Sequence, residues 1–286
     1  MESTNPKMSR EEWYALVCRS LADDKVVSPF GDLLPRFPSE ELQRNTTSLS
    51  GEQALSQANG FYGDISTALE SHDIRIESDW AILDFGSCWG RISRFFMRDV
   101  PKKNIHGVDV EKTFVDTCNS LFDSDRFSVC PAIPPCGFAD SNIDLISAYS
   151  VFSHLSESAF NAWMREFSRI LKPGGIVAFT TRNDGFLDYC SELGKRIHEL
   201  SGYPRALAAM LGDDPQLKSR YLSGNFVFAG GKGVSGGGSM NDSFYGEAFI
   251  PRAYVEERLH DDFEILDFKR IGQAYDQALF VLRKRA

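Results

Sequence analysis

The chain has 286 residues and a formal net charge of −9 at pH 7, enough length for one large α/β domain with added segments or for two smaller domains. No apolar run approaches the roughly 20 residues of a membrane helix, and residues 1–10 lack the apolar segment of a secretory signal. We therefore expect a cytoplasmic protein without membrane insertion. The acidic charge would repel DNA and RNA, so we expect no nucleic-acid partner.

The cysteines and histidines do not indicate a metal site. The six cysteines form no CxxC pair and show no zinc-ligand spacing with histidine. We expect reduced thiols and no bound metal. The sequence pattern does not indicate an oligomeric state.

Residues 1–78 are predicted to form an N-terminal helical extension. Helical periodicity is present over 11–21 and 54–69, and the stretch 28–38 between them contains three prolines, which favours turns. From residue 79 the pattern changes, so the extension is expected to end there.

Short apolar runs alternate with amphipathic helical segments over residues 79–185. The apolar runs predict strands at 80–85, 104–110, 127–130, 143–150 and 176–181. The intervening segments, among them 91–100 and 157–171, predict helices. This alternation is typical of an α/β fold with a doubly wound, mostly parallel sheet.

The pattern loosens after residue 185. We predict a helix over 186–211 and a mobile loop over 229–239, which contains six glycines, so that 186–245 forms an insertion or lid after the fifth strand. Residues 246–286 are predicted to complete the core with a helix at 251–260 and a β-hairpin. The whole sheet then has seven strands with an antiparallel last strand.

The segment Asp84-Phe-Gly-Ser-Cys-Trp-Gly90 lies between the first predicted strand and the following helix. A ligand at this turn would meet the carboxyl ends of parallel strands and a helix N-terminus. A nicotinamide fingerprint requires glycines at positions 86, 88 and 91, and Cys88 and Arg91 stand at two of them. This disfavours a nicotinamide oxidoreductase.

Asp109 ends the second apolar run. A carboxylate there could accept hydrogen bonds from both ribose hydroxyls of an adenosine. The alternative is an exposed cap of the helix that begins near Glu111.

Residues 79–183 resemble the class I S-adenosylmethionine-dependent methyltransferases. The resemblance is carried by Leu83–Gly86 with Trp89-Gly90, Gly107–Asp109, Phe138–Leu145 and Arg169–Gly175. More loosely, residues 34–38, 150–155 and 245–248 are similar to a bacterial subgroup with an unassigned acceptor.

The resemblance implies that S-adenosylmethionine is the cofactor and S-adenosylhomocysteine the product. It implies that Asp109 holds the ribose, that Val110 packs on the adenine, and that a loop surrounds the methionine part of the cofactor. The loop residues are Asp84, Gly86, Ser87, Cys88, Trp89 and Gly90. Cys88 replaces the middle glycine of the family loop, so we expect weakened binding, and Ala132 and Ile133 occupy the stretch where an acidic residue often reads the adenine.

The acceptor is expected to be a small molecule or a saccharide, with O-methylation favoured. His154, after the fourth strand, is the leading candidate for a general base because its ordinary pKa suits proton removal. The alternative is a histidine at a helix entry, bonded to Ser156 or to backbone. Tyr149 is a second catalytic candidate, or a core aromatic residue.

Three further polar side chains are candidates for the acceptor side. Glu247, a catalytic candidate, and Tyr245 could hydrogen-bond a polar acceptor, although Glu247 could instead interact with the N-terminus of the last helix. Arg182 could bind an acidic group of the acceptor, or form a surface salt bridge. A different class of function is also open at this point, a non-catalytic S-adenosylmethionine-binding module of a larger assembly.

Overall fold

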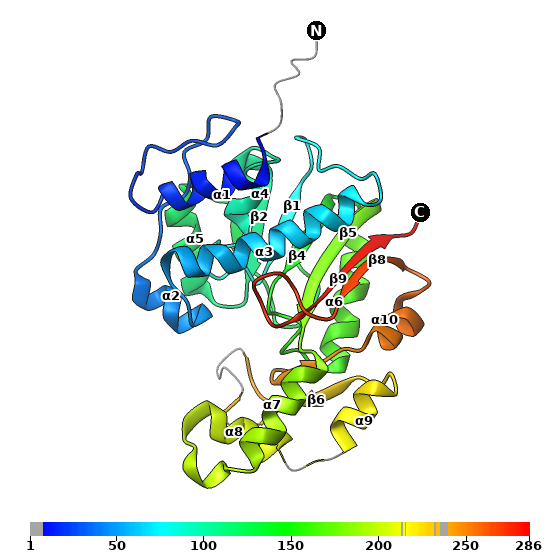
Figure 1. Ribbon diagram of the computed structural model, residues 1–286. Coiled ribbons are helices and arrows are strands. Elements are labelled where there is room, and N and C mark those ends of the chain that lie inside the picture. Colours follow the sequence, from blue (N-terminus) through cyan, green and yellow to red (C-terminus); the bar gives the residue numbers. More distant parts are fainter. Residues whose placement is uncertain (1–7, 213, 215, 232, 235–239) are drawn as a thin grey trace. The chain divides into compact units, whose positions relative to one another are not determined.

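The computed structural model describes residues 8–212, 214, 216–231, 233–234 and 240–286 (Figure 1). The chain forms two compact units, residues 1–129 and 130–286. Seven strands form one sheet in the order β3-β2-β1-β4-β5-β9-β8. Their bounds are β1 (Ile82–Phe85), β2 (Ile105–Asp109), β3 (Phe127–Val129), β4 (Ile143–Ala148), β5 (Leu171–Thr181), β8 (Phe263–Lys269) and β9 (Ala278–Lys284).

The strand directions confirm the predicted fold class. β1 pairs in parallel with β2, β2 with β3, and β4 with β5, whereas the last strand, β9, is antiparallel to both β5 and β8. This mostly parallel order with helical crossovers is that of a doubly wound α/β sheet.

Three helices form the N-terminal extension in the first unit: α1 (Arg10–Arg19), α2 (Glu40–Thr47) and α3 (Gly51–Glu70). A reciprocal capping box between Ser9 and Glu12 starts α1. The sequence analysis did not predict α2, which begins after Ser39, whose side chain accepts a hydrogen bond from the Leu42 amide. Trp13 is fully buried and its indole N–H donates to the Phe95 carbonyl.

The first unit continues with α4 (Ser93–Phe96), η1 (Lys102–Asn104) and α5 (Lys112–Phe122) between its three strands. The predicted helix over 91–100 is reduced to the four residues of α4. The amides of Phe95, Met97 and Asp99 bond to carbonyls three residues back, so the backbone turns tightly instead of continuing an α-helix.

In the second unit, α6 (Glu157–Ile170) lies between β4 and β5 in the chain. β5 begins at Leu171, five residues before the predicted start, and pairs Leu171 with Ile143 ahead of an irregularity in the register. Phe152 forms edge-to-face contacts with Phe160, Phe167 and Phe179 and anchors the core.

The segment between β5 and β8 contains α7 (Asp184–Gly194), η2 (Ile197–Glu199), α8 (Gly202–Leu211), α9 (Gln216–Leu222), β6 (Val227–Ala229), β7 (Glu247–Phe249) and α10 (Arg252–Leu259) (Figure 1). The single helix predicted over 186–211 is interrupted after Gly194. A Cβ added to Gly194 would lie 2.8 Å from the carbonyl oxygen of Gly212. The end of α7 and the end of α8 therefore pack closely at these two glycines.

The same segment contains an antiparallel pair of strands, β6 and β7, which the sequence analysis did not predict. Of the glycine-rich stretch predicted as a mobile loop, residues 232 and 235–239 lie outside the described residues. The four-part division of the chain proposed from the sequence stays a prediction. In the described part of the chain, no helix is long and apolar enough to cross a membrane.

Candidate active site

The loop between β1 and α4 is folded back on the end of β2. The amides of Gly86 and Ser87 both donate to the Val108 carbonyl, at 2.9 and 3.0 Å. Gly86, Cys88 and Gly90 have left-handed backbone, with φ of +75°, +51° and +74°. Alternating residues of the loop therefore require a conformation that glycine adopts most easily.

Asp84 and Gly90 fix the two ends of this loop. The buried Asp84 carboxylate accepts hydrogen bonds from the amide and the hydroxyl of Ser93, at 3.0 and 2.6 Å, and so joins β1 to the start of α4. At Gly90 a side chain would meet the ring of Phe122, since an ideal Cβ lies 2.3 Å from Cε2. Both residues are thus fixed by the geometry of the turn.

The carboxylate of Asp109 lies directly beneath the loop. Its Oδ2 accepts from the Cys88 amide at 2.9 Å and its Oδ1 from the Glu111 amide at 3.0 Å. Burial raises the pKa of Asp109, and these backbone donors act in the opposite direction. Each oxygen has a further lone pair, so the carboxylate can still receive a vicinal diol. Only 8% of Asp109 is exposed, so it is not the exposed cap considered above.

Cys88, which is half-buried, and Trp89 differ in how they contact the rest of the first unit. Burial raises the pKa of the Cys88 thiol to about 11, although a hydrogen bond with Thr46 of α2 lowers it. The thiol therefore stays protonated at neutral pH and connects the loop to the N-terminal extension. Trp89 is fully buried, 6.4 Å from Phe37 between ring centroids, and Val110 is half-buried.

In the second unit, residues 153–156 pair with residues 244–248. The Gly246 amide donates to the His154 carbonyl at 2.7 Å, and the Ser156 amide donates to the Phe244 carbonyl at 2.7 Å. This pairing brings together three candidates that are far apart in the sequence: His154, Tyr245 and Glu247.

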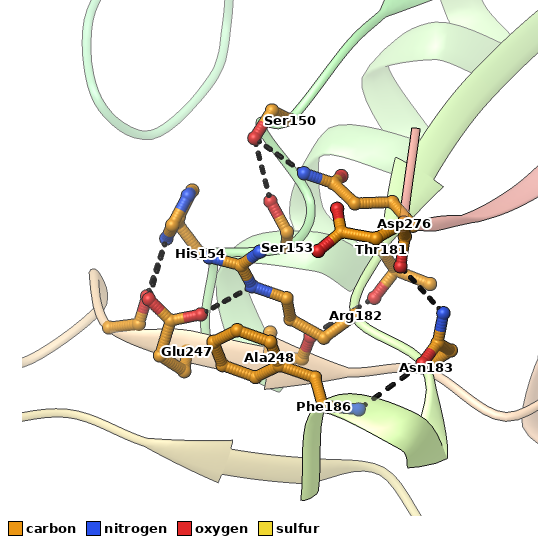
Figure 2. A network of polar contacts seen from close by, with 12 residues as sticks. Ser150, Ser153, His154, Thr181, Arg182, Asn183, Phe186, Glu247, Ala248 and Asp276 are labelled. Carbon is orange, nitrogen blue, oxygen red and sulfur yellow. Dashed lines mark hydrogen bonds and ion pairs between the residues drawn. The ribbon is translucent and has the colours of Figure 1, made fainter. Parts of the chain in front are cut away.

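The imidazole of His154 is held on two sides. Its Nδ1 lies 2.8 Å from the Gly246 carbonyl oxygen, and its ring is stacked on Tyr245 at a centroid distance of 5.0 Å. A carbonyl only accepts hydrogen bonds, so we assign the proton of the neutral ring to Nδ1 and the lone pair to Nε2. Figure 2 shows the opposite edge of this ring turned away from Glu247.

Glu247 is the fully buried centre of this group (Figure 2). Its Oε2 accepts from Arg182 Nε at 2.7 Å, and its Oε1 accepts from the Tyr203 hydroxyl at 2.6 Å and lies 3.4 Å from His154 Nδ1. Burial alone would raise the pKa of Glu247, but His154 and Arg182 lower it to about 2. The carboxylate is therefore ionised at neutral pH.

Arg182 balances this buried charge. Its side chain is 13% exposed, and its guanidinium lies 4.0 Å from the centre of the Phe186 ring. Burial would lower the pKa of Arg182, and the Glu247 carboxylate raises it above its ordinary value. The pair is a buried ion pair, and not the surface salt bridge considered from the sequence.

Tyr149 lies next to a strained turn at the end of β4. Its ring meets Tyr275 edge to face at 5.6 Å. The following residue, Ser150, has φ of +59°, and its amide donates to Thr180 Oγ1 at 2.7 Å while its hydroxyl accepts from Gln277 at 2.8 Å. Non-glycine residues in this conformation persist where their surroundings hold them.

Sequence reasoning did not select Tyr203, Thr180 or Gln277, because none of them belongs to a motif and their roles arise from contacts between distant segments. Among the described residues, no group of three or more His, Cys, Asp and Glu is placed to hold a metal ion.

A family model and solved structures resemble parts of this chain. Residues 83–179 match a family model described as a methyltransferase domain. A protein from Listeria monocytogenes, assigned to the S-adenosylmethionine-dependent methyltransferases, has 12% sequence identity and a TM-score of 0.51, over 81% of this chain and 99% of its own. An S-adenosylmethionine-dependent methyltransferase from Methanosarcina mazei has 17% identity and a TM-score of 0.49, over 76% of this chain and 96% of its own. No curated protein matches the sequence.

The seven-stranded sheet and the family match define a methyltransferase domain over residues 83–179. The chain therefore contains a methyltransferase domain and is an enzyme, as expected from its resemblance to the class I S-adenosylmethionine-dependent methyltransferases.

Proposed function

We propose that this enzyme methylates a hydroxyl oxygen of a small-molecule or saccharide acceptor, with His154 as the general base. The observation that carries the proposal is the bond between His154 Nδ1 and the Gly246 carbonyl. Because this bond leaves the lone pair on Nε2, the neutral ring is ready to take a proton on its outward edge.

The proposed cofactor-binding residues come from the first unit. The group is Asp84, Gly86, Ser87, Cys88, Trp89, Gly90, Asp109 and Val110. The donor set fits an adenosine, because the Asp109 carboxylate has lone pairs for two ribose hydroxyls beyond the bonds from Cys88 and Glu111. When bound, S-adenosylmethionine supplies a methyl group on a positively charged sulfur.

Charge balance in the His154 group supports a neutral hydroxyl acceptor. Glu247 and Arg182 form a buried ion pair, so the group has no net charge while His154 is neutral. An alcohol must lose its proton as its oxygen forms the new bond, and Nε2 of His154 would receive that proton. The Glu247 carboxylate, 3.4 Å from Nδ1, would then stabilise the imidazolium.

Other side chains of the second unit are proposed to bind the acceptor or orient the base. Tyr245, stacked on His154, and Tyr149 are our candidates for contact with the acceptor. Arg182 uses Nε for Glu247 and has further N–H groups for a polar group of the acceptor. Glu247 is proposed to orient the base. On the acidic composition of the chain, we further propose that the acceptor is not a nucleic acid. A cytoplasmic location also stays part of this proposal.

The test is methyl transfer from labelled S-adenosylmethionine to a panel of sugars, phenols, other alcohols and amines, with wild type, His154→Gln and His198→Gln. His198 is an exposed histidine and serves as the control. We expect a hydroxyl acceptor to be methylated, and His154→Gln to lower kcat by about 10²–10⁴. Calorimetry should give the same cofactor affinity for both variants. Methylation of amines alone, or full activity of His154→Gln, would overturn the proposal.

A further inference from the structure

One side chain of the segment between β5 and β6 reaches the group around His154. Tyr203, near the start of α8, donates its hydroxyl proton to Oε1 of Glu247 at 2.6 Å. The same oxygen lies 3.4 Å from Nδ1 of His154. A single carboxylate oxygen thus faces both the phenol and the imidazole.

The phenol acts as a hydrogen-bond donor in this group. Although 41% of Tyr203 is exposed, partial burial of its hydroxyl end and the neighbouring Glu247 raise its pKa above the ordinary value, so the hydroxyl keeps its proton over the working range of the enzyme. Its one proton is directed to Glu247. Tyr203 therefore withdraws negative charge from the oxygen that faces the base.

The packing of α8 holds this hydroxyl in place. Leu207, Ala208 and Leu211 of α8 belong to one buried cluster with Leu187, Cys190 and Leu193 of α7. Asn183, the N-cap of α7, lies two residues after the end of β5 and fixes the direction in which this helix leaves the sheet. The position of the Tyr203 hydroxyl is therefore tied to the end of β5 through α7.

We propose that Tyr203 is a positioning residue, which fixes the Glu247 carboxylate and thereby adjusts how readily His154 takes and releases the acceptor's proton. This inference rests on the proposed role of His154. Without the phenol hydroxyl, Oε1 would carry more negative charge and be free to turn toward Nδ1. The Glu247 carboxylate would then stabilise the imidazolium more strongly, against the opposing positive charge of Arg182 on the other side of Glu247.

The experiment compares the pH dependence of kcat in wild type, Tyr203→Phe and Tyr189→Phe. Tyr189 is a half-exposed tyrosine of α7 whose ring contacts Phe186, so its variant removes a hydroxyl from the same pair of helices. For Tyr203→Phe we expect the acid limb of the profile to move up by roughly half to one pH unit, so that kcat on this limb falls about three- to tenfold. The KM for S-adenosylmethionine should not change.

Profiles of Tyr203→Phe and wild type that superimpose would overturn the inference. So would an equal loss in Tyr189→Phe, because it would indicate a general effect on these helices. The double variant Tyr203→Phe with His154→Gln distinguishes a failure of this inference from a failure of the proposed function. If His154 is the base, Tyr203→Phe has no further effect in the His154→Gln background; if the effect of Tyr203→Phe persists there, His154 is not the base.

Discussion

At the scale of single residues, Cys88 is the residue of the cofactor loop that fits its backbone conformation least, since this conformation favours glycine. Its φ of +51° is left-handed, yet the residue carries a Cβ and a sulfur. The surroundings hold it there, since the amide bonds to Asp109 and the thiol of the half-buried side chain contacts Thr46. The contact with Thr46 offers a reason for a cysteine where glycine would be free of strain.

Two substitutions separate the strain from the contact of the thiol. Cys88→Gly and Cys88→Ala both remove the sulfur, but only alanine keeps a Cβ in the left-handed region. That conformation costs a non-glycine residue about 1–2 kcal/mol, and the greater freedom of unfolded glycine offsets part of it. We therefore expect Cys88→Gly to be more stable than Cys88→Ala by about 1 kcal/mol in urea unfolding. Equal stability, or a more stable alanine variant, would show that the loop relaxes around the side chain.

At the scale of elements, Asn183 connects β5, α7 and the loop between β8 and β9. Its Oδ1 accepts from the Phe186 amide at 3.2 Å and caps α7, while Nδ2 donates to the carbonyls of Arg270 and Asp276 at 3.1 and 2.6 Å (Figure 2). Arg270 adds a pair of bonds to Asp184 in the first turn of α7. One buried amide thus orients the helix that precedes α8.

Removing this amide should destabilise the second unit. Asn183→Ala deletes the helix cap and removes a donor from two partly buried hydrogen bonds, so we expect a loss of about 2–3 kcal/mol. Asn225→Ala, which removes an exposed contact with the Arg220 carbonyl, should cost less than about 0.5 kcal/mol. Thermal and urea unfolding measure both. A loss for Asn183→Ala no larger than that of Asn225→Ala would contradict this account of the connection.

Element prediction succeeded where a segment's own pattern decides its structure. The apolar runs before Gly86 and through Asp109 became β1 and β2, because buried parallel strands are continuous apolar stretches. It was less accurate where distant contacts decide. The break after Gly194 depends on packing against Gly212, and β6 exists because it pairs with β7.

At the scale of the whole molecule, the sequence predicted the methyltransferase domain and a mostly parallel, seven-stranded sheet with an antiparallel last strand. It also selected His154, Arg182, Tyr245 and Glu247, which the structure brings together. Residues of a turn motif can be identified from the sequence because they lie next to one another in the chain. The three contacts of Glu247 could not be predicted, since they join β7 to the end of β5, to α8 and to His154 after β4. Tyr203 therefore emerged only from the structure.

The measurement that tests the central claim most directly is calorimetric binding of S-adenosylmethionine to wild type, Asp109→Asn and Asp116→Asn. Asp116 is a carboxylate on the exposed face of α5, 60% exposed and paired with Lys112, so its variant controls for the loss of one negative charge. Circular dichroism verifies that each variant is folded. We predict binding to wild type and Asp116→Asn with similar affinity, and a loss of roughly 10- to 100-fold in Asp109→Asn, because bonds from the two ribose hydroxyls to a charged acceptor are weakened. Equal affinity of Asp109→Asn and wild type, or no binding to folded wild type, would contradict the account.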